Sequence, residues 1–130
     1  MERKFLIDSN IVIDYLAGRL PNSGMEFLKP IVNQAPNVSV ITKIEVLGFN
    51  SSEEMHEFLS GFFNDSHVIE LTDTVVNKTI DLRRKVKIKT PDAIVAATAL
   101  SQNLTLLTRN LKDFQAIFGL DCLNPWELEK

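Results

Sequence analysis

Short apolar runs of strand length alternate along this chain with longer segments of helical length. The strand-like runs lie at 5–7, 37–40, 68–71, 104–107 and 120–123, and the helical segments at 11–16, 25–33, 42–47, 53–63, 75–86, 91–100 and 111–117. Such alternation is typical of a sheet whose parallel strands are joined by helices. The strands are nearly all apolar, as expected when both faces of the sheet are covered. We predict a single α/β domain over residues 1–130, with a central, mainly parallel sheet of four to five short strands flanked by helices.

The composition is that of an ordinary globular protein. Hydrophobic residues make up 45% of the 130 positions and charged residues 24%, so one domain of this size can bury its own core. The single cysteine, Cys122, excludes an internal disulfide. Asp8 and Asp14 interrupt the first apolar stretch, which argues against a signal peptide, and no apolar run is long enough to span a bilayer. We expect a cytoplasmic protein without a membrane contact.

The balance of charge narrows the possible functions. A formal net charge of −3 argues against a dedicated nucleic-acid-binding module, which would usually be basic. It does not exclude a nuclease, because a site that holds a metal ion is itself acidic. The positions of the charges therefore matter more than their sum.

Four acidic residues stand close to predicted helix starts: Asp8, Glu45, Asp92 and Asp113. Taken singly, each has a structural explanation, because carboxylates near a helix N-terminus are favoured by the helix dipole. Thr42 and Glu45 have the spacing of a capping box, with Glu45 at the third helical position. Thr90 suits the N-cap of the next helix, which makes Asp92 its second residue, and Asn110 precedes Asp113 in a similar way.

Taken together, the four acids indicate a metal site. In a parallel sheet the carboxyl ends of the strands share one edge, and Asp8, Glu45 and Asp113 each follow a strand. The sequence alone does not place Asp92 at that edge. Two carboxylates about 4 Å apart repel each other by roughly 4 kcal/mol at an effective dielectric constant of 20, a cost that helix capping does not explain. A divalent cation would explain it, and a set of oxygen ligands favours Mg²⁺ or Mn²⁺.

Three segments resemble the sequence motifs of PIN-domain ribonucleases. Residues 5–11, FLIDSNI, resemble the opening strand that ends in Asp-x-Asn, and residues 91–99, PDAIVAATA, resemble the second acidic motif. Residues 106–114, LLTRNLKDF, resemble the closing motif, Thr-x-Asn-x-x-Asp-Phe. Glu45 occupies the place of the family's lone glutamate. The resemblance extends from Phe5 to about Trp126, which is nearly the whole chain.

This resemblance implies a function and partners. The size of the chain is similar to that of VapC-like toxins of bacterial toxin–antitoxin pairs. The implied activity is an endoribonuclease that cleaves a structured RNA, such as a tRNA or a ribosomal RNA. The implied partners are a second copy of the chain, in a homodimer, and a cognate antitoxin protein encoded beside it.

The resemblance and the chemistry together assign roles within the site. We expect Asp8, Asp92 and Asp113 to hold Mg²⁺ or Mn²⁺, and Glu45 to be a further ligand or to position the attacking water. Three neighbouring polar residues are expected to orient these carboxylates and the water, a role that is compatible with helix capping. They are Asn10, Thr108 and Asn110.

Basic residues near these acids are candidates for RNA contacts. Arg109 and Lys112 lie beside Asp113 in the sequence and are well placed to contact phosphate. Lys87 and Lys89 belong to a basic run, 83–89, that leads toward Asp92. For this run the alternative is that the end of a helix simply favours cations.

An apolar stripe on the fourth helical segment has two interpretations. Its members recur at helical spacing: Met55, Phe58, Leu59, Phe62 and Phe63. Such a stripe is usually core, but part of it could also receive the amphipathic helix of an antitoxin. Trp126, after Pro125, is expected to fix the C-terminal segment in place.

Two other functions remain open at this point. One is a catalytically inert PIN-like module that only binds protein. The other is a phosphoryl-accepting receiver domain, which also combines an α/β sheet, acidic residues and Mg²⁺. A receiver domain would need an acceptor aspartate at the end of the third strand, where Asp73 is better explained as a helix-start residue.

Overall fold

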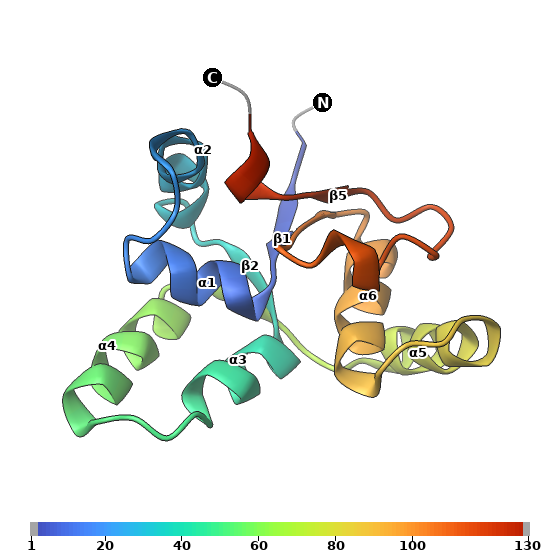
Figure 1. The fold of residues 1–130 in the computed structure, drawn as a ribbon. Helices are drawn as coiled ribbons and strands as arrows, with labels where there is room; N and C mark the ends of the chain where they lie inside the picture. Colours follow the sequence, from blue (N-terminus) through green and yellow to red (C-terminus); the bar gives the residue numbers. More distant parts are fainter. Residues whose placement is uncertain (1–2, 129–130) are drawn as a thin grey trace.

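The computed structural model describes residues 3–128, so four of the residues expected in the domain, 1–2 and 129–130, lie outside it. A five-stranded sheet in the order β3-β2-β1-β4-β5 forms its centre, and every strand pair is parallel (Figure 1). The strands are β1 (Phe5–Ile7), β2 (Asn37–Ser39), β3 (His67–Ile69), β4 (Thr105–Leu107) and β5 (Cys122–Leu123). The predicted α/β class and the parallel sheet are confirmed.

Helices cover both faces of this sheet. They are α1 (Ser9–Leu16), α2 (Asn22–Val32), α3 (Val40–Leu47), α4 (Glu53–Asn64), α5 (Asp73–Lys85) and α6 (Thr90–Gln102), followed by the 3₁₀ turns η1 (Leu111–Asp113) and η2 (Pro125–Glu127). Figure 1 shows α1 to α4 on one side and α5 and α6 on the other. In residues 3–128, no helix combines the length and apolar character needed to cross a membrane.

Alternating residues of the central strands divide the core into two clusters. Leu6 and Leu106 belong to the cluster that packs against α5 and α6, whereas Ile7 and Leu107 belong to the cluster beneath α1 to α4. All four side chains are fully or almost fully buried. The apolar character of the strands is therefore explained by burial on both faces.

The register of β1 and β4 determines what stands at the carboxyl edge. Ile7 pairs with Leu107, and the chain continues on each side into Asp8 and Thr108. The backbone N–H of Asp8 donates to the carbonyl of Leu107 at 2.9 Å, which extends the ladder by one residue. Two polar side chains that are distant in the sequence are therefore neighbours at this edge.

Helix α3 begins earlier than predicted. Ser39 is its N-cap, and the Ser39 hydroxyl accepts the backbone N–H of Ile41 at 3.1 Å. The predicted capping box of Thr42 and Glu45 is therefore wrong, because β2 passes directly into the helix and Ser39 already fills the capping position. Thr42 is buried inside the helix, and Glu45 lies on its exposed surface.

Two other helix boundaries differ from prediction. Lys89, not Thr90, is the N-cap of α6, and the Thr90 hydroxyl instead accepts a hydrogen bond from Arg83 Nη1 at 2.6 Å. The helix expected over 111–117 is a single turn, η1, followed by successive turns with i to i+3 hydrogen bonds. The side chains of Phe114 and Ile117, which lie in these turns, are both buried. Because buried apolar residues three positions apart also fit a helical pattern, the spacing led to the wrong prediction.

The C-terminal turn η2 packs closely on α2 through a glycine. A Cβ atom added to Gly24 would clash with the backbone carbonyl oxygen of Pro125. That carbonyl belongs to the backbone and cannot rotate away as a side chain would. A side chain at position 24 must therefore move η2 away from α2.

We predict that Gly24→Ala lowers the free energy of unfolding by about 1–3 kcal/mol, the usual cost of overpacking. Gly61→Ala is the matched control, because Gly61 also lies within a helix but has no atom within 4 Å of the added Cβ. This control should raise the free energy of unfolding by about 0.5–1 kcal/mol. Urea denaturation of both variants measures the two effects, and equal stabilities would contradict the close contact.

Candidate active site

Asp8 is held in a fixed orientation at the carboxyl end of β1. Its side chain caps α1, with Oδ1 accepting the backbone N–H of Ser9 at 2.9 Å. Its second oxygen, Oδ2, accepts the Thr108 hydroxyl at 2.8 Å. Asp8 is only 6% exposed and Thr108 is fully buried, so water competes little for this hydrogen bond. The carboxylate therefore cannot turn freely.

The loop after β4 is fastened to the start of α1. The backbone N–H of Asn110 donates to Thr108 Oγ1 at 3.2 Å, and the backbone N–H of Arg109 donates to Asn10 Oδ1 at 3.3 Å. Asn10 and Thr108 thus occupy the supporting positions expected for them. Asn110 takes part through its backbone, and the residue as a whole is exposed.

Glu45 reaches the same edge from α3. The hydroxyl of Ser9 donates to its Oε1 at 3.1 Å, which joins the exposed Glu45 side chain to the residue after Asp8. Ser9 was not among the predicted site residues. Its place beside Asp8, within a motif already considered functional, was the available signal.

Electrostatic effects link the four carboxylates. Burial raises the pKa of Asp8 most strongly; hydrogen bonds from Thr108 and Ser9 oppose this rise, and the charges of Glu45 and Asp113 add to it. Burial also raises the pKa of Asp92, and the charges of Asp8 and Asp113 raise it further. The structure therefore brings Asp92, which the sequence could not place, into the same acidic environment.

These four carboxylates make no ion pair with a protein cation within the described residues, although the charge of Lys89 acts on Asp92. Within residues 3–128, the ion pairs of acidic side chains involve Asp14 and Asp81, and none of them includes Asp8, Glu45, Asp92 or Asp113. In the same described part, no three His, Cys, Asp or Glu side chains stand close enough together to hold a metal ion. The four carboxylates therefore interact electrostatically but do not form a complete set of metal ligands. Their oxygen atoms are of the type that a hard divalent cation prefers.

The predicted basic residues lie in different surroundings. Lys89 precedes α6, and its charge lowers the pKa of Asp92, so it stands near the acidic residues. Lys87 and Lys112 are exposed. Arg109 is also exposed, but its guanidinium lies over the ring of Trp126, with Cζ 4.2 Å from the ring centroid.

Sequence analysis missed the role of Asp14. This residue is 5% exposed on α1, and its Oδ2 accepts the indole N–H of Trp126 at 3.0 Å. Its position three residues after the buried Ile11 was a signal that it lies on the inner face of the helix. The expectation that Trp126 fixes the C-terminal segment agrees with this hydrogen bond.

One sizeable cavity lies away from the acidic residues. It encloses about 620 Å³ at the opposite, amino end of the sheet, where Arg3, Asn37 and His67 are among its lining residues. The Nδ1 atom of His67 lies 3.1 Å from Asn37 Oδ1. Since none of the four acids lines this cavity, we base the candidate site on the carboxylates and not on cavity size.

Comparison with known proteins gives a consistent result. The family model of the PIN domain matches residues 5–117. Ribonuclease VapC1 of Methanocaldococcus jannaschii is 26% identical in an alignment of 126 positions that covers 92% of this chain and 86% of that protein. A chain of a toxin–antitoxin complex from Klebsiella pneumoniae is 28% identical, with a TM-score of 0.78 over 96% of this chain and 100% of that chain. A chain of DNA-bound VapBC from Salmonella typhimurium has the same fold, with 21% identity and a TM-score of 0.80 over 95% of this chain and 99% of that chain.

The raised carboxyl pKa values predict that Asp92→Asn stabilises the metal-free protein at neutral pH. A carboxyl whose pKa is raised by folding lowers the free energy of unfolding as the pH rises above its unfolded-state pKa, and the full loss is reached above its folded-state pKa. An amide in its place carries no charge and therefore avoids this loss of stability. The gain should disappear below about pH 4, where the wild-type carboxyl is protonated in both states. Thermal melting in EDTA across this pH range measures the effect.

Asp8→Asn should show a smaller gain, because the hydrogen bonds from Thr108 and Ser9 already favour the charged form of Asp8. The control is Asp81→Asn, which removes an exposed acid that is paired with Lys78 and Lys85. Losing such pairs costs about 0–1 kcal/mol, so no gain is expected. If Asp92→Asn melts no higher than wild type at neutral pH, the ionised Asp92 side chain does not destabilise the folded protein.

Proposed function

The chain belongs to the PIN-domain family, and on that premise we propose that it is a metal-dependent endoribonuclease that hydrolyses phosphodiester bonds in structured RNA. Its substrate class would be tRNA or ribosomal RNA, and its biological role that of the toxin in a toxin–antitoxin pair. The observation that carries the proposal is the group of four electrostatically linked carboxylates, none of which forms an ion pair among the described residues.

Each carboxylate has a proposed role. Asp8, Asp92 and Asp113 would hold Mg²⁺ or Mn²⁺, and Glu45 would be a further ligand or would orient the attacking water. The bound ion would lower the pKa of a water molecule and stabilise negative charge on the phosphate. Ser9, through its hydrogen bond at 3.1 Å, would keep Glu45 directed toward this edge.

Supporting residues limit how far the site can relax. Thr108 fixes Asp8 by donating to it, while Asn10 and the backbone N–H of Asn110 hold the loop that follows β4. Preorganised groups of this kind save the free energy that would otherwise be spent in ordering them. Four basic residues near the site are proposed as contacts for RNA phosphates: Arg109, Lys112, Lys87 and Lys89.

The two alternative functions receive less support. Asp73 is the first residue of α5, where Thr72 is the N-cap, which agrees with its interpretation as a helix-start residue and not as a phosphoryl acceptor. An inert binding module would gain nothing from a group of carboxylates that form no ion pairs among the described residues, since repulsion among the carboxylates only destabilises the fold. A cleavage assay separates the enzyme from the inert module.

We predict that the protein cleaves RNA in Mg²⁺ or Mn²⁺ and loses this activity in excess EDTA. Asp8→Asn and Asp92→Asn should each reduce cleavage by at least about a hundredfold, because each removes a charged ligand of the proposed ion. Asp81→Asn, an acid in exposed ion pairs on α5, should cleave as wild type does. Gel analysis of a mixture of tRNA and ribosomal RNA measures RNA cleavage by the wild type and the three variants. Full activity in EDTA would contradict the metal hypothesis.

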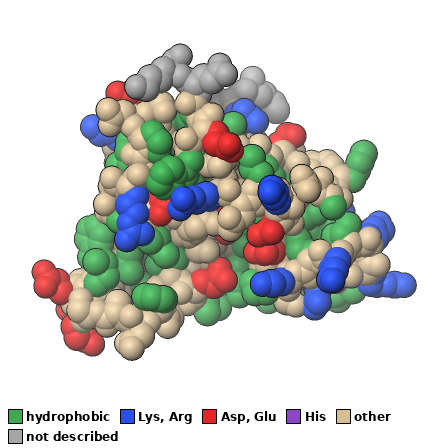
Figure 2. All heavy atoms as spheres, viewed as in Figure 1, with side chains coloured by type: hydrophobic (Ala, Val, Ile, Leu, Met, Phe, Trp, Pro, Cys, Tyr) green, Lys and Arg blue, Asp and Glu red, His purple; other side chains and the backbone are tan. Residues whose placement is uncertain are grey.

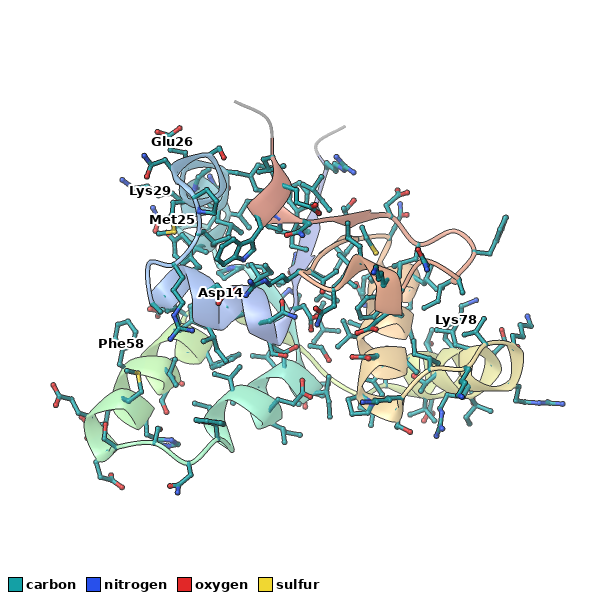
Figure 3. The ribbon with its side chains drawn as sticks, viewed as in Figure 1. Asp14, Met25, Glu26, Lys29, Phe58 and Lys78 are labelled. Atoms are coloured by element: carbon teal, nitrogen blue, oxygen red, sulfur yellow. The ribbon has the colours of Figure 1, made fainter. Side chains whose placement is uncertain are left out.

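The proposed antitoxin contact lies on part of the apolar stripe of α4. Phe63 is 2% exposed and belongs to the core beneath α1 to α4, whereas Phe58 is 55% exposed. Figure 2 shows hydrophobic side chains gathered over this side of the molecule, and Figure 3 labels Phe58 on α4. Phe62 is partly buried and packs edge-on against Phe63, with ring centroids 5.1 Å apart, so Phe58 is the more accessible of the two for a partner.

We predict that Phe58→Ser weakens binding of the cognate antitoxin by roughly ten- to a hundredfold, since burying an aromatic side chain contributes about 1.5–3 kcal/mol. Its melting temperature should stay close to that of wild type, because the side chain is more than half exposed. Phe63→Ser is the matched control and should instead melt far lower. Calorimetric titration with the product of the neighbouring gene measures the affinity, and normal binding by Phe58→Ser would place the partner elsewhere.

Homodimer formation and a cytoplasmic location remain predictions. Analytical ultracentrifugation of the free protein tests the first of them. Among the proteins compared, the Klebsiella pneumoniae chain comes from a toxin–antitoxin complex, and the Salmonella typhimurium chain comes from DNA-bound VapBC. Those descriptions support the proposal of an antitoxin partner for this chain.

A further inference from the structure

One buried carboxylate lies outside the proposed metal site and joins three separate segments. Asp14 Oδ2 accepts the indole N–H of Trp126 at 3.0 Å and lies 3.6 Å from Arg109 Nη1. Its other oxygen, Oδ1, lies 3.9 Å from Arg19 Nη1. Figure 3 labels Asp14 on α1, in the middle of the molecule. The acid therefore has a cation near each of its two oxygens.

The two arginines keep much of their surface free. The side chain of Arg109 is 52% exposed and that of Arg19 is 64% exposed, whereas the Asp14 side chain is 7% exposed. A guanidinium carries five N–H donors in a rigid plane, so one contact with Asp14 leaves others available. Stacking on Trp126 further restricts the orientation of the Arg109 guanidinium.

Arg109 also stands directly beside the proposed catalytic residues. The residue before it, Thr108, donates its hydroxyl to Asp8, and the Arg109 backbone N–H donates to Asn10. Its carbonyl accepts the side-chain amide of Asn124 at 3.5 Å. Both the backbone and the side chain of Arg109 are thus tied to neighbours at the carboxyl edge.

We propose that Asp14 and Trp126 are positioning residues that hold Arg109, with Arg19 beside it, as a fixed contact for the phosphate backbone of RNA. This inference rests on the proposed ribonuclease function and deepens it. A flexible arginine loses rotamer freedom when it binds phosphate, and an arginine that is already held loses less. RNA is favoured over an acidic peptide as the ligand because Arg109 adjoins the carboxylates at which a phosphate must be cleaved.

The proposal makes an unusual prediction about the sign of a charge effect. Asp14→Asn removes a negative charge, and simple electrostatics would make the protein bind RNA more tightly. If Asp14 instead holds Arg109 in place, the same variant binds RNA more weakly. Trp126→Phe tests the same support without changing any charge, since it keeps an aromatic ring and removes the N–H that donates to Asp14.

The experiment measures the affinity for a fluorescently labelled RNA hairpin in EDTA, over a range of salt concentrations. We expect Arg109→Met to weaken binding roughly tenfold and to reduce the salt slope by about 0.9, the value for one lost phosphate contact with a duplex. Asp14→Asn should weaken binding by about threefold or more, and Trp126→Phe by a smaller factor. Asp81→Asn is the charge control and should bind as tightly as wild type or more tightly.

A double variant separates positioning from general destabilisation. If Asp14 acts through Arg109, then adding Asp14→Asn to Arg109→Met produces no further loss of affinity. Thermal melting accompanies each measurement. If Asp14→Asn fails to fold, Trp126→Phe decides the question, and unchanged RNA affinity in that variant overturns the proposal.

Other outcomes separate this inference from the proposed function. Tighter or unchanged RNA binding by folded Asp14→Asn overturns the inference, because Asp14 then only neutralises the arginines. Weaker antitoxin binding by Arg109→Met with unchanged RNA affinity also overturns it, and assigns the arginines to a protein partner. Wild-type protein that binds the hairpin with the expected variant effects but cleaves no RNA in Mg²⁺ or Mn²⁺ contradicts the proposed function and leaves the phosphate contact supported.

Discussion

The parallel pairing of β1 with β4 is the constraint on which the rest of the molecule depends. Because the two strands are in register through Ile7 and Leu107, the next residue of each, Asp8 and Thr108, meet at the same edge. The hydrogen bond between them is buried, with Asp8 6% exposed and Thr108 fully buried. The loop after Thr108 is tied to the first turn of α1 through Asn10, and the remaining acids come to that edge from α3, α6 and η1.

The negative charge of Asp14 and the negative charges of the proposed metal site are compensated to different extents. Asp14 is buried but is compensated by two arginines and an indole N–H, so its charge contributes to a stable connection between segments. For Asp8 and Asp92, burial and then the charges of other carboxylates raise the pKa values, so these two acids weaken the fold when they are ionised. Locally unfavourable interactions of this kind are expected where a protein binds or reacts, because the same charges become favourable when a cation arrives. The contrast distinguishes the acids that support the fold from those proposed to act in catalysis.

The sequence was sufficient for the features that depend on local pattern. The strands, the order of the elements and the resemblance of the segments around Asp8, Asp92 and Asp113 to the PIN-domain motifs could all be read from short segments. Helix starts were less predictable, because Ser39 and Lys89 took the capping positions that Thr42 and Thr90 were expected to fill. The sequence contains even less indication of the long-range contacts. Neither the hydrogen bond between Ser9 and Glu45 nor the pairing of Asp14 with Trp126 has a local signature, and only packing shows that Phe62 leans on Phe63 while Phe58 does not.

The separation of contact partners along the chain has a consequence for biosynthesis. Asp8 and Thr108 are 100 positions apart, and Asp14 and Trp126 are 112 apart, so α1 leaves the ribosome long before either of its partners. Closing such long loops costs conformational entropy, which contacts of the intervening chain must offset. A nascent chain that ends before residue 108 therefore carries α1 without Thr108, Arg109 or Trp126. The edge that holds the acids is therefore complete only after Thr108 and Trp126 have been synthesised, and a shorter nascent chain lacks the hydrogen bonds that fix it.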